Sequence, residues 1–300
     1  MDTLINQAVV FTKPLHHLGI SLTPDELAGQ TVSFLSERGF RVAYSKKVTG
    51  PELAEREIIR QHYLIYSKAS YGDILITDEG RARFREAFEK EWDDEVEARR
   101  IMGNPQLIEY KDIDVHKLFS LWNAQFGGGH TRKIQDGVII ARIEELDCYC
   151  INAFYPAMEE NFYHPATEID YYVVEFDPAQ LSWEQFRKNI LGSTDASKAD
   201  PDSFRGQLYA QYPVSFPGRD NFVHGSAGAF EGFVERVIHE PDVVMTAGPI
   251  GQYLAGRGVT LDSFADWKAR QSISALGQLF DDTEEQNTAD VIQTLDLVHF

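Results

Sequence analysis

The spacing of hydrophobic and polar residues predicts alternating strands and helices in the first part of the chain. Residues 7–12 form an apolar run that predicts a buried strand. The motif Thr23-Pro24-Asp25-Glu26 marks a helix start, because its threonine can cap the first turn and its glutamate stands in the capping-box position. We expect this helix to end at Gly39, where a strand over residues 40–45 begins.

Later segments continue this alternation. Gly50-Pro51 predicts the start of a second helix, which carries Tyr63. Together the segments give a β-α-β-β-α-β count, the split β-α-β or ferredoxin-like arrangement of an α+β protein, which needs no glycine-rich phosphate loop. The other expected elements are a strand at 169–176, a helix at 182–190, a strand at 207–212 and a helix at 229–239.

The middle of the chain has a pattern of its own and predicts an inserted subdomain. Residues 79–101 have the pattern of a charged amphipathic helix and 118–124 that of a second helix, and strands are expected at 137–144 and 148–154. The stretch 126–133 is glycine-rich and basic. It follows a helix rather than a strand, so we favour a turn over a nucleotide site.

The most informative residues for function are His224-Gly225-Ser226, with Asn221 just before them and Glu235 eleven residues after the histidine. A neutral imidazole can accept a phosphoryl group through one ring nitrogen when a carboxylate holds the proton of the other. Glu235 lies on the predicted helix 229–239 and could be that carboxylate. The pattern therefore predicts a histidine nucleophile with an orienting acid.

Other residues could bind a nucleotide. Fixed cations, hydroxyl donors, a Mg²⁺ ion and an aromatic face are what a nucleoside triphosphate requires around its phosphates and base. The chain offers Lys13-Pro14, Tyr63, Arg187-Lys188, Thr194 and Arg205 in this order. Structural interpretations stand beside these, since Tyr63 could be a helix core residue, Arg205 a surface ion-pair residue and Thr194 a cap.

This ordered set resembles the nucleoside diphosphate kinase family. In that family a strand ending in Lys-Pro, a His-Tyr pair on a helix, an Arg…Gly-x-Thr loop, a Ser/Thr-x-Arg and a final Asn-x-x-His-Gly-Ser-Asp occur in this order. Two stretches are similar beyond single residues. Residues 36–42 resemble the end of the family's first helix and its second strand, and Thr194 and Arg205 keep the family's eleven-residue step.

The resemblance implies a role for each matched residue. His224 would be the phosphohistidine nucleophile, Glu235 its orienting carboxylate and Ser226 a residue that assists beside it. Tyr71, eight residues after Tyr63, falls where the family places an aromatic ring that stacks on the base. The residues that would bind phosphate and ribose are Lys13, Tyr63, Arg187 or Lys188, Thr194, Arg205 and Asn221.

The implied activity is ping-pong transfer of the γ-phosphoryl group of ATP to a nucleoside diphosphate, with Mg²⁺ held through the nucleotide phosphates. ATP and nucleoside diphosphates are then the partners, and a homo-oligomer is expected because the family assembles from such subunits. The implied domains are a nucleoside diphosphate kinase-like core at 1–75 and 165–245, an inserted subdomain at 76–164 and a C-terminal extension at 246–300.

The chain also departs from the family pattern. Ala227-Gly228 stand where the family has an aspartate after His-Gly-Ser, and Lys188 rather than Arg187 has the family's spacing from Thr194. Lysine supplies charge without the bidentate fork of arginine. These departures keep two alternatives open: a nucleotide-binding regulatory module without turnover, and a histidine phosphotransferase with a non-nucleotide acceptor.

Composition restricts the partners. The formal net charge of −19 argues against nucleic acid and against a membrane surface, which both favour basic patches. No apolar run is long enough to span a bilayer and the start lacks a basic leader, so a cytoplasmic location is expected. Cys148 and Cys150 lie on one face of a predicted strand and suit buried thiols better than a disulfide.

Overall fold

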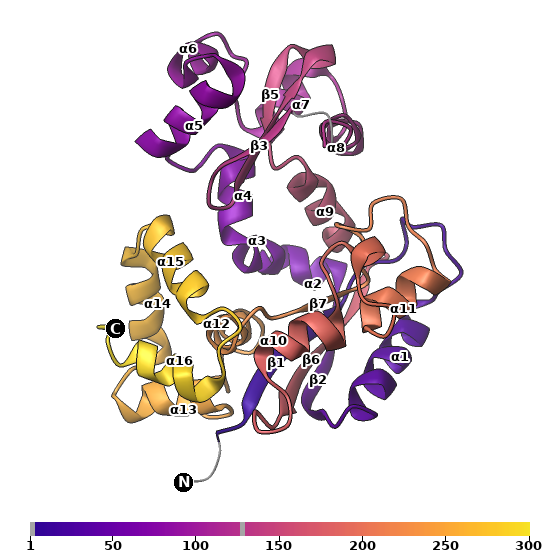
Figure 1. Ribbon diagram of the computed structural model, residues 1–300, viewed down its shortest axis with the longest axis vertical. Coiled ribbons are helices and arrows are strands. Elements are labelled where there is room, and N and C mark those ends of the chain that lie inside the picture. The colour runs from indigo at the N-terminus through magenta and orange to yellow at the C-terminus, as the bar shows by residue number, and fades with distance from the viewer. Residues whose placement is uncertain (1–3, 127–129) are drawn as a thin grey trace. The chain divides into compact units, whose positions relative to one another are not determined.

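The computed structural model describes residues 4–126 and 130–300, which form two units (Figure 1). The first unit contains the chain up to Ile58 and from Phe162 onward, and the second contains Ile59–Asn161. The three glycines of the predicted basic turn, Gly127–Gly129, lie outside the described residues.

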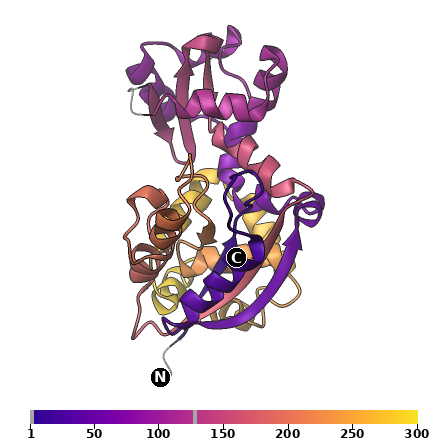
Figure 2. The same ribbon diagram turned by 90° about the vertical axis from the view of Figure 1, so that its right-hand side faces the viewer.

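A four-stranded antiparallel sheet organises the first unit (Figure 2). Its strands are β1 (Asn6–Thr12), β2 (Arg41–Thr49), β6 (Glu168–Phe176) and β7 (Val223–Gly225), in the order β2-β6-β1-β7. Since β6 lies between β1 and β2, and β1 lies between β6 and β7, both halves are split β-α-β units. The ferredoxin-like α+β core is therefore confirmed.

The sequence explains why these strands are central and how the first helix begins. All residues of β1 are buried, as is typical of a strand covered on both faces. Helix α1 (Pro24–Ser36) starts with the predicted capping box, in which Thr23 accepts the N–H of Glu26 and Glu26 accepts the N–H of Thr23. One continuous hydrophobic core joins side chains from this helix, the sheet and the later helices.

The expected strand at 207–212 is wrong, because this segment is helix α11 (Phe204–Gln211). Ser203 caps the helix by accepting the N–H of Gly206, which stabilises the helical start locally. The fourth strand of the sheet is β7 instead, which carries His224. It has three residues, too few for a strand pattern to stand out, and it exists because β1 offers it a partner.

Two predicted long helices are broken. The helix expected after Gly50-Pro51 is divided into α2 (Gly50–Glu55), α3 (Ile58–His62) and α4 (Leu64–Tyr71). The helix expected at 79–101 is divided into α5 (Asp78–Phe88) and α6 (Trp92–Glu97), because Glu89 takes a left-handed conformation with φ 55°.

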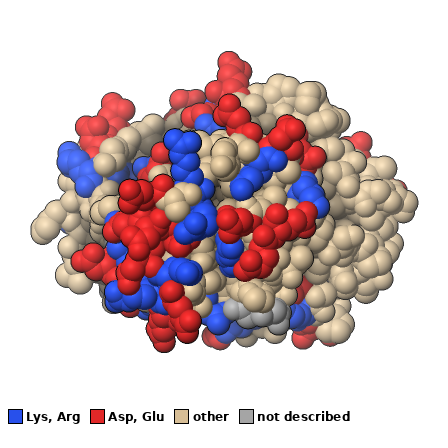
Figure 3. Space-filling view, turned by 90° about the horizontal axis from the view of Figure 1, so that it is seen from above, with Lys and Arg blue, Asp and Glu red and all other residues tan. Residues whose placement is uncertain are grey.

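The second unit has its own sheet, in the order β3-β4-β5, and its own hydrophobic core. Lys and Arg side chains are interspersed with Asp and Glu on the face shown in Figure 3, as expected for solvated surface. After α6, the elements of the second unit are α7 (Asn104–Lys111), α8 (Val115–Asn123), β3 (Thr131–Gln135), β4 (Val138–Ile143), η1 (Glu144–Leu146), β5 (Cys148–Ile151) and α9 (Phe154–Tyr163).

The remaining elements of the first unit precede and follow β7. They are α10 (Trp183–Gln185), the π-helix η2 (Phe186–Leu191), η3 (Ala196–Lys198), α12 (Ala229–His239), α13 (Pro249–Gly256), α14 (Leu261–Arg270), α15 (Ile273–Thr283) and α16 (Thr288–Leu295). The bounds of α12 agree with those of the predicted helix at 229–239. Within the described residues, no helix has both the length and the apolar character needed to cross a membrane.

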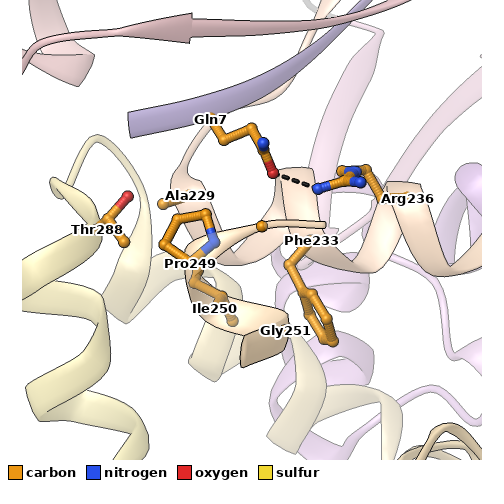
Figure 4. A pocket seen from close by; sticks show the side chains of 9 residues that line it. Gln7, Ala229, Phe233, Arg236, Pro249, Ile250, Gly251 and Thr288 are labelled. Carbon is orange, nitrogen blue, oxygen red and sulfur yellow. Dashed lines mark hydrogen bonds between the residues drawn. The ribbon is translucent and has the colours of Figure 1, made fainter. Parts of the chain in front are cut away.

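The C-terminal helices pack on α12 and form part of the body of the first unit. Arg236 of α12 binds the side chain of Gln7 in β1, and Pro249, Ile250 and Thr288 lie around this pair (Figure 4). The space left between them is about 10 Å³, room for about one water molecule. The extension is therefore closely packed against the sheet and α12.

One substitution tests this packing. A Cβ atom on Gly228, at the start of α12, would lie 2.6 Å from the carbonyl oxygen of Thr283 in the extension. We expect Gly228→Ala to lower the free energy of unfolding by about 1–3 kcal/mol, because the backbone must move apart. Urea denaturation measures this change.

Gly29→Ala is the matched control. Gly29 lies in α1 with nothing within 4 Å of its would-be Cβ, so alanine should raise stability by up to about 1 kcal/mol. Equal effects of the two substitutions would contradict close docking of the extension.

Candidate functional site

Strand β7 places His224 at the centre of the candidate site. In the ladder between β7 and β1, His224 stands opposite Phe11, and their rings stack at 4.5 Å between centroids. Phe222 enters the strand with φ +67°, and its carbonyl accepts the N–H of Lys13 at 2.7 Å. The sheet thus brings the Lys-Pro end of β1 next to the histidine.

A buried carboxylate joins His224 to Ser226. Glu235 accepts a hydrogen bond from Nε2 of His224 at 2.7 Å and another from the hydroxyl of Ser226 at 2.6 Å. An ionised carboxylate can only accept, so Nε2 carries the hydrogen and the lone pair of the neutral ring is on Nδ1. The ring is held in the tautomer that a nucleophile at Nδ1 requires.

Electrostatics keep this imidazole neutral. Burial, followed by the positive charges of Lys13, Arg205 and Arg187, holds the pKa of His224 well below its ordinary value of 6.5. Burial and the charge of Arg205 also lower the pKa of Lys13 to about 7. Three cations are therefore near the histidine, an arrangement that suits phosphate groups.

Arg205 and Asn221 connect the loop after η2 to β7. Arg205 donates to the carbonyls of Gly192 at 2.7 Å and Val223 at 2.9 Å. Asn221 donates to the carbonyl of Thr194 at 2.7 Å, while its own buried carbonyl oxygen has no partner among the residues described. Thr194 is exposed beside Asn221, so the structure brings these predicted residues together.

Arg187 and Lys188 have different surroundings. Arg187 lies near enough to His224 to influence its pKa, and its Nη1 binds the carboxylates of Glu284 and Glu285. Lys188 is exposed and pairs with Glu184 at 2.7 Å. Of the two predicted cations, Arg187 is thus the one that contributes to the site.

Tyr63 and Tyr71 belong to the second unit. Tyr63 immediately precedes α4, with its ring against that of His62 at 4.6 Å. Tyr71 donates from its hydroxyl to Glu159, and the guanidinium of Arg60 lies 5.0 Å from its ring centroid. The site described above is confined to residues of the first unit.

Two features of the site were not expected from the sequence. The Asp220 carboxylate accepts hydrogen bonds from Nε and Nη2 of Arg219, each at 2.7 Å, and lies 3.3 Å from Nε2 of His17. The backbone carbonyl of Arg219 accepts a hydrogen bond from the Lys13 ammonium at 3.2 Å. The double histidine after Lys13-Pro14 was the one signal for this network. It positions the Lys13 ammonium through the carbonyl of Arg219.

The second unexpected feature is Glu231. Its carboxylate accepts the N–H of Ala227 at 2.7 Å, directly after Ser226. Burial and the charge of Glu235 raise the pKa of Glu231. A side chain in the first turn of α12 thus holds the backbone of the loop that follows Ser226.

Comparisons with known proteins give a weak likeness. No family model and no curated protein matches the chain. Among solved structures, the apo nucleoside diphosphate kinase from Encephalitozoon cuniculi has 15% identity and a TM-score of 0.37, covering 80% of this chain and 91% of that one. An NDP kinase from Pyrobaculum aerophilum also has 15% identity and a TM-score of 0.37, covering 78% of this chain and 94% of that one.

A third similar structure is a transition-state mimic of the nucleoside-diphosphate kinase from Borrelia burgdorferi with bound vanadate and ADP. It has 16% identity and a TM-score of 0.35, covering 80% of this chain and 89% of that one. Likenesses of this strength do not decide function, which has to be inferred from the chain's own side chains.

The pH dependence of stability tests the environment of His224. The folded protein keeps this ring neutral, whereas the unfolded chain takes up its proton as pH falls through 6.5. The unfolded state then binds more protons, so the free energy of unfolding should decrease below that pH by up to about 1.4 kcal/mol per unit.

Urea denaturation of the wild type and of His224→Asn between about pH 7 and pH 5 measures this contribution. The variant should lose less stability on acidification, because it lacks the titrating ring. Identical slopes for the two proteins would contradict a His224 held neutral by its surroundings.

Proposed function

We propose that the protein is a nucleoside diphosphate kinase-like phosphotransferase with His224 as its nucleophile. The observation that carries the proposal is the chain of hydrogen bonds from Ser226 through Glu235 to Nε2 of His224, beside three cations. A site that only bound nucleotides would not need an imidazole fixed in one tautomer.

The reaction has two similar halves. Nδ1 of His224 attacks the γ-phosphorus of ATP, the bond to the β–γ bridging oxygen breaks, and ADP leaves with the bonding electrons. A terminal phosphate oxygen of a nucleoside diphosphate then attacks the phosphohistidine, and Nδ1 recovers its lone pair. Glu235 holds the Nε2 proton throughout and stabilises the positive charge that the ring gains.

Side chains of the first unit can stabilise the charge of the transferring group. Lys13 and Arg187 would supply positive charge. A Mg²⁺ ion would arrive bound to the nucleotide phosphates, and it would supply neutralisation of their negative charge.

A nucleotide-binding module without turnover is the second candidate. The engagement of Arg187 by two carboxylates favours it, because that cation is less available to a transferring phosphoryl group. The intact Glu235–His224 pair favours the enzyme.

Phosphorylation of the protein distinguishes these candidates. Incubation with γ-³²P-labelled ATP and Mg²⁺ should give a label that is lost in acid and stable in base, as for phosphohistidine. His224→Ala should abolish it, whereas His130→Ala, which changes an exposed histidine of the second unit, should keep it. EDTA should prevent labelling, and an added nucleoside diphosphate should remove the label.

Each contrary result has a clear meaning. A label that survives His224→Ala refutes the assignment of the nucleophile. Tight nucleotide binding with no label supports the binding module. Label on His224 that no nucleoside diphosphate discharges supports a phosphotransferase with another acceptor.

The pKa of Lys13 predicts how nucleotide binding depends on pH. Since this pKa is about 7, the ammonium charge is present below that pH and is lost as pH rises above it. The KM for ATP should therefore increase more steeply above pH 7 in the wild type than in Lys13→Arg, whose guanidinium stays charged. Steady-state kinetics or direct titration measures this; parallel profiles would exclude Lys13 as a phosphate ligand.

A further inference from the structure

Two carboxylates from the C-terminal helices meet the arginine of the candidate site. Glu284 and Glu285, which we call the acidic turn, lie between α15 and α16. Nη1 of Arg187 donates to both, at 3.0 Å in the case of Glu285. The same arginine lies near enough to His224 to influence its titration, so the site and the acidic turn share one cation.

The acidic turn is held in place without Arg187. The N–H of Glu285 donates to the carbonyl of Ala227 at 2.9 Å, next to Ser226. After the turn, Asn6 of β1 accepts the N–H of Thr288 at 2.9 Å and donates to Asn287 at 2.7 Å. The backbone of the acidic turn is therefore anchored on both sides by hydrogen bonds that do not involve Arg187.

Local backbone geometry shows how closely the turn approaches the nucleophile loop. Gly228 leaves room for the carbonyl of Thr283, which a Cβ atom would meet at 2.6 Å. Glu285 takes a left-handed conformation with φ 59°, which is unfavourable for a residue with a side chain. The surrounding contacts thus enforce this position of the acidic turn beside residues 224–228.

The charges in this region leave an excess of negative charge. Two carboxylates face one guanidinium, and the nearby Lys188 is already paired with Glu184 at 2.7 Å, against 3.9 Å to Glu285. Both bonds from Arg187 to the turn use Nη1. Within the part of the chain that the structure describes, its Nε and Nη2 have no partner, and this edge of the guanidinium can bind a phosphate side-on.

We propose that the acidic turn is a built-in competitor anion, which engages Arg187 and repels incoming phosphates and so weakens nucleotide binding at His224. This inference rests on the proposed function, because it assumes that phosphates bind beside the histidine. The turn neutralises the charge of Arg187 and adds like charge at short range. Because the backbone fixes the turn, the opposition persists while a nucleotide is bound.

Neutralising the turn should strengthen binding. In isothermal titration with Mg²⁺ and ADP, Glu284→Gln/Glu285→Gln should lower the Kd by about fivefold, the scale of a partly exposed ion pair. The control is Asp282→Asn/Asp290→Asn, which removes the same total charge from the extension without touching Arg187. Its Kd should stay within about twofold of wild type, since both side chains are exposed to solvent and neither pairs with Arg187.

A double-mutant cycle tests whether the effect acts through Arg187. In the Arg187→Gln variant, adding Glu284→Gln/Glu285→Gln should lower the Kd for ADP by a smaller factor. We expect this fold decrease to be less than half of the fold decrease that the same two substitutions cause when Arg187 is present. A Kd that rises or stays the same on neutralisation overturns the proposal, and a rise would make the turn a positioning element. Thermal unfolding of each variant confirms that it is folded before titration.

Failure of the inference and failure of the proposed function give different results. ADP binding requires no phosphoryl transfer, so the titration is informative even when no label forms on His224. If the neutralised variant binds ADP more tightly but no label forms on His224, the competitor role stands and the proposed phosphotransferase activity is overturned. Label on His224 together with an unchanged Kd supports the enzyme and overturns the competitor role. If neither the wild type nor the neutralised variant binds ADP, both proposals are overturned.

Discussion

The buried hydroxyl of Ser226 is the contact on which the arrangement of the site depends. Its oxygen accepts the N–H of Val9 in β1 at 2.9 Å and its hydrogen is donated to Glu235 in α12 at 2.6 Å. The backbone N–H of the same serine donates to the carbonyl of Val9 at 3.0 Å. Removal of this hydroxyl would take one hydrogen bond from the buried Glu235 carboxylate and the side-chain acceptor from the N–H of Val9, and losing hydrogen bonds to buried polar groups is costly.

This contact makes the fold and the chemistry interdependent. The same hydrogen bonds that attach β7 to the sheet determine which way the Glu235 carboxylate points, and that carboxylate determines the tautomer of His224. The stacking of Phe11 against the imidazole adds a second constraint from β1. A neutral, oriented imidazole is thus a product of packing, and the surrounding cations then lower its pKa further.

An acidic protein can still offer a basic site because charges are sorted in three dimensions. The formal net charge is −19, and acidic and basic side chains are interspersed on the face that Figure 3 shows. Lys13, Arg187 and Arg205 come from separate parts of the chain and converge near His224. Glu284 and Glu285 are the exception, since they bring negative charge close to that site.

Local sequence determined most of the elements and the identity of the central residues. The capping box at Thr23, the helix at 229–239 and the apolar strands are short-range patterns, and the structure has them. The placement of Glu235 on a helix at 229–239, eleven residues after His224, likewise follows from a local pattern. Such features are predictable because the residues that cause them are neighbours in sequence.

Only the tertiary structure decided the rest, because the partners are far apart along the chain. Three residues at 223–225 become a strand since β1 lies alongside, and no local pattern announces that pairing. Whether Arg187 or Lys188 lies near His224 depends on which side of η2 faces the site. The ion pairs of Arg187 with Glu284 and Glu285 depend on a turn almost a hundred positions away in the sequence. Contacts of this kind follow from how the chain closes on itself, which residue spacing alone does not contain.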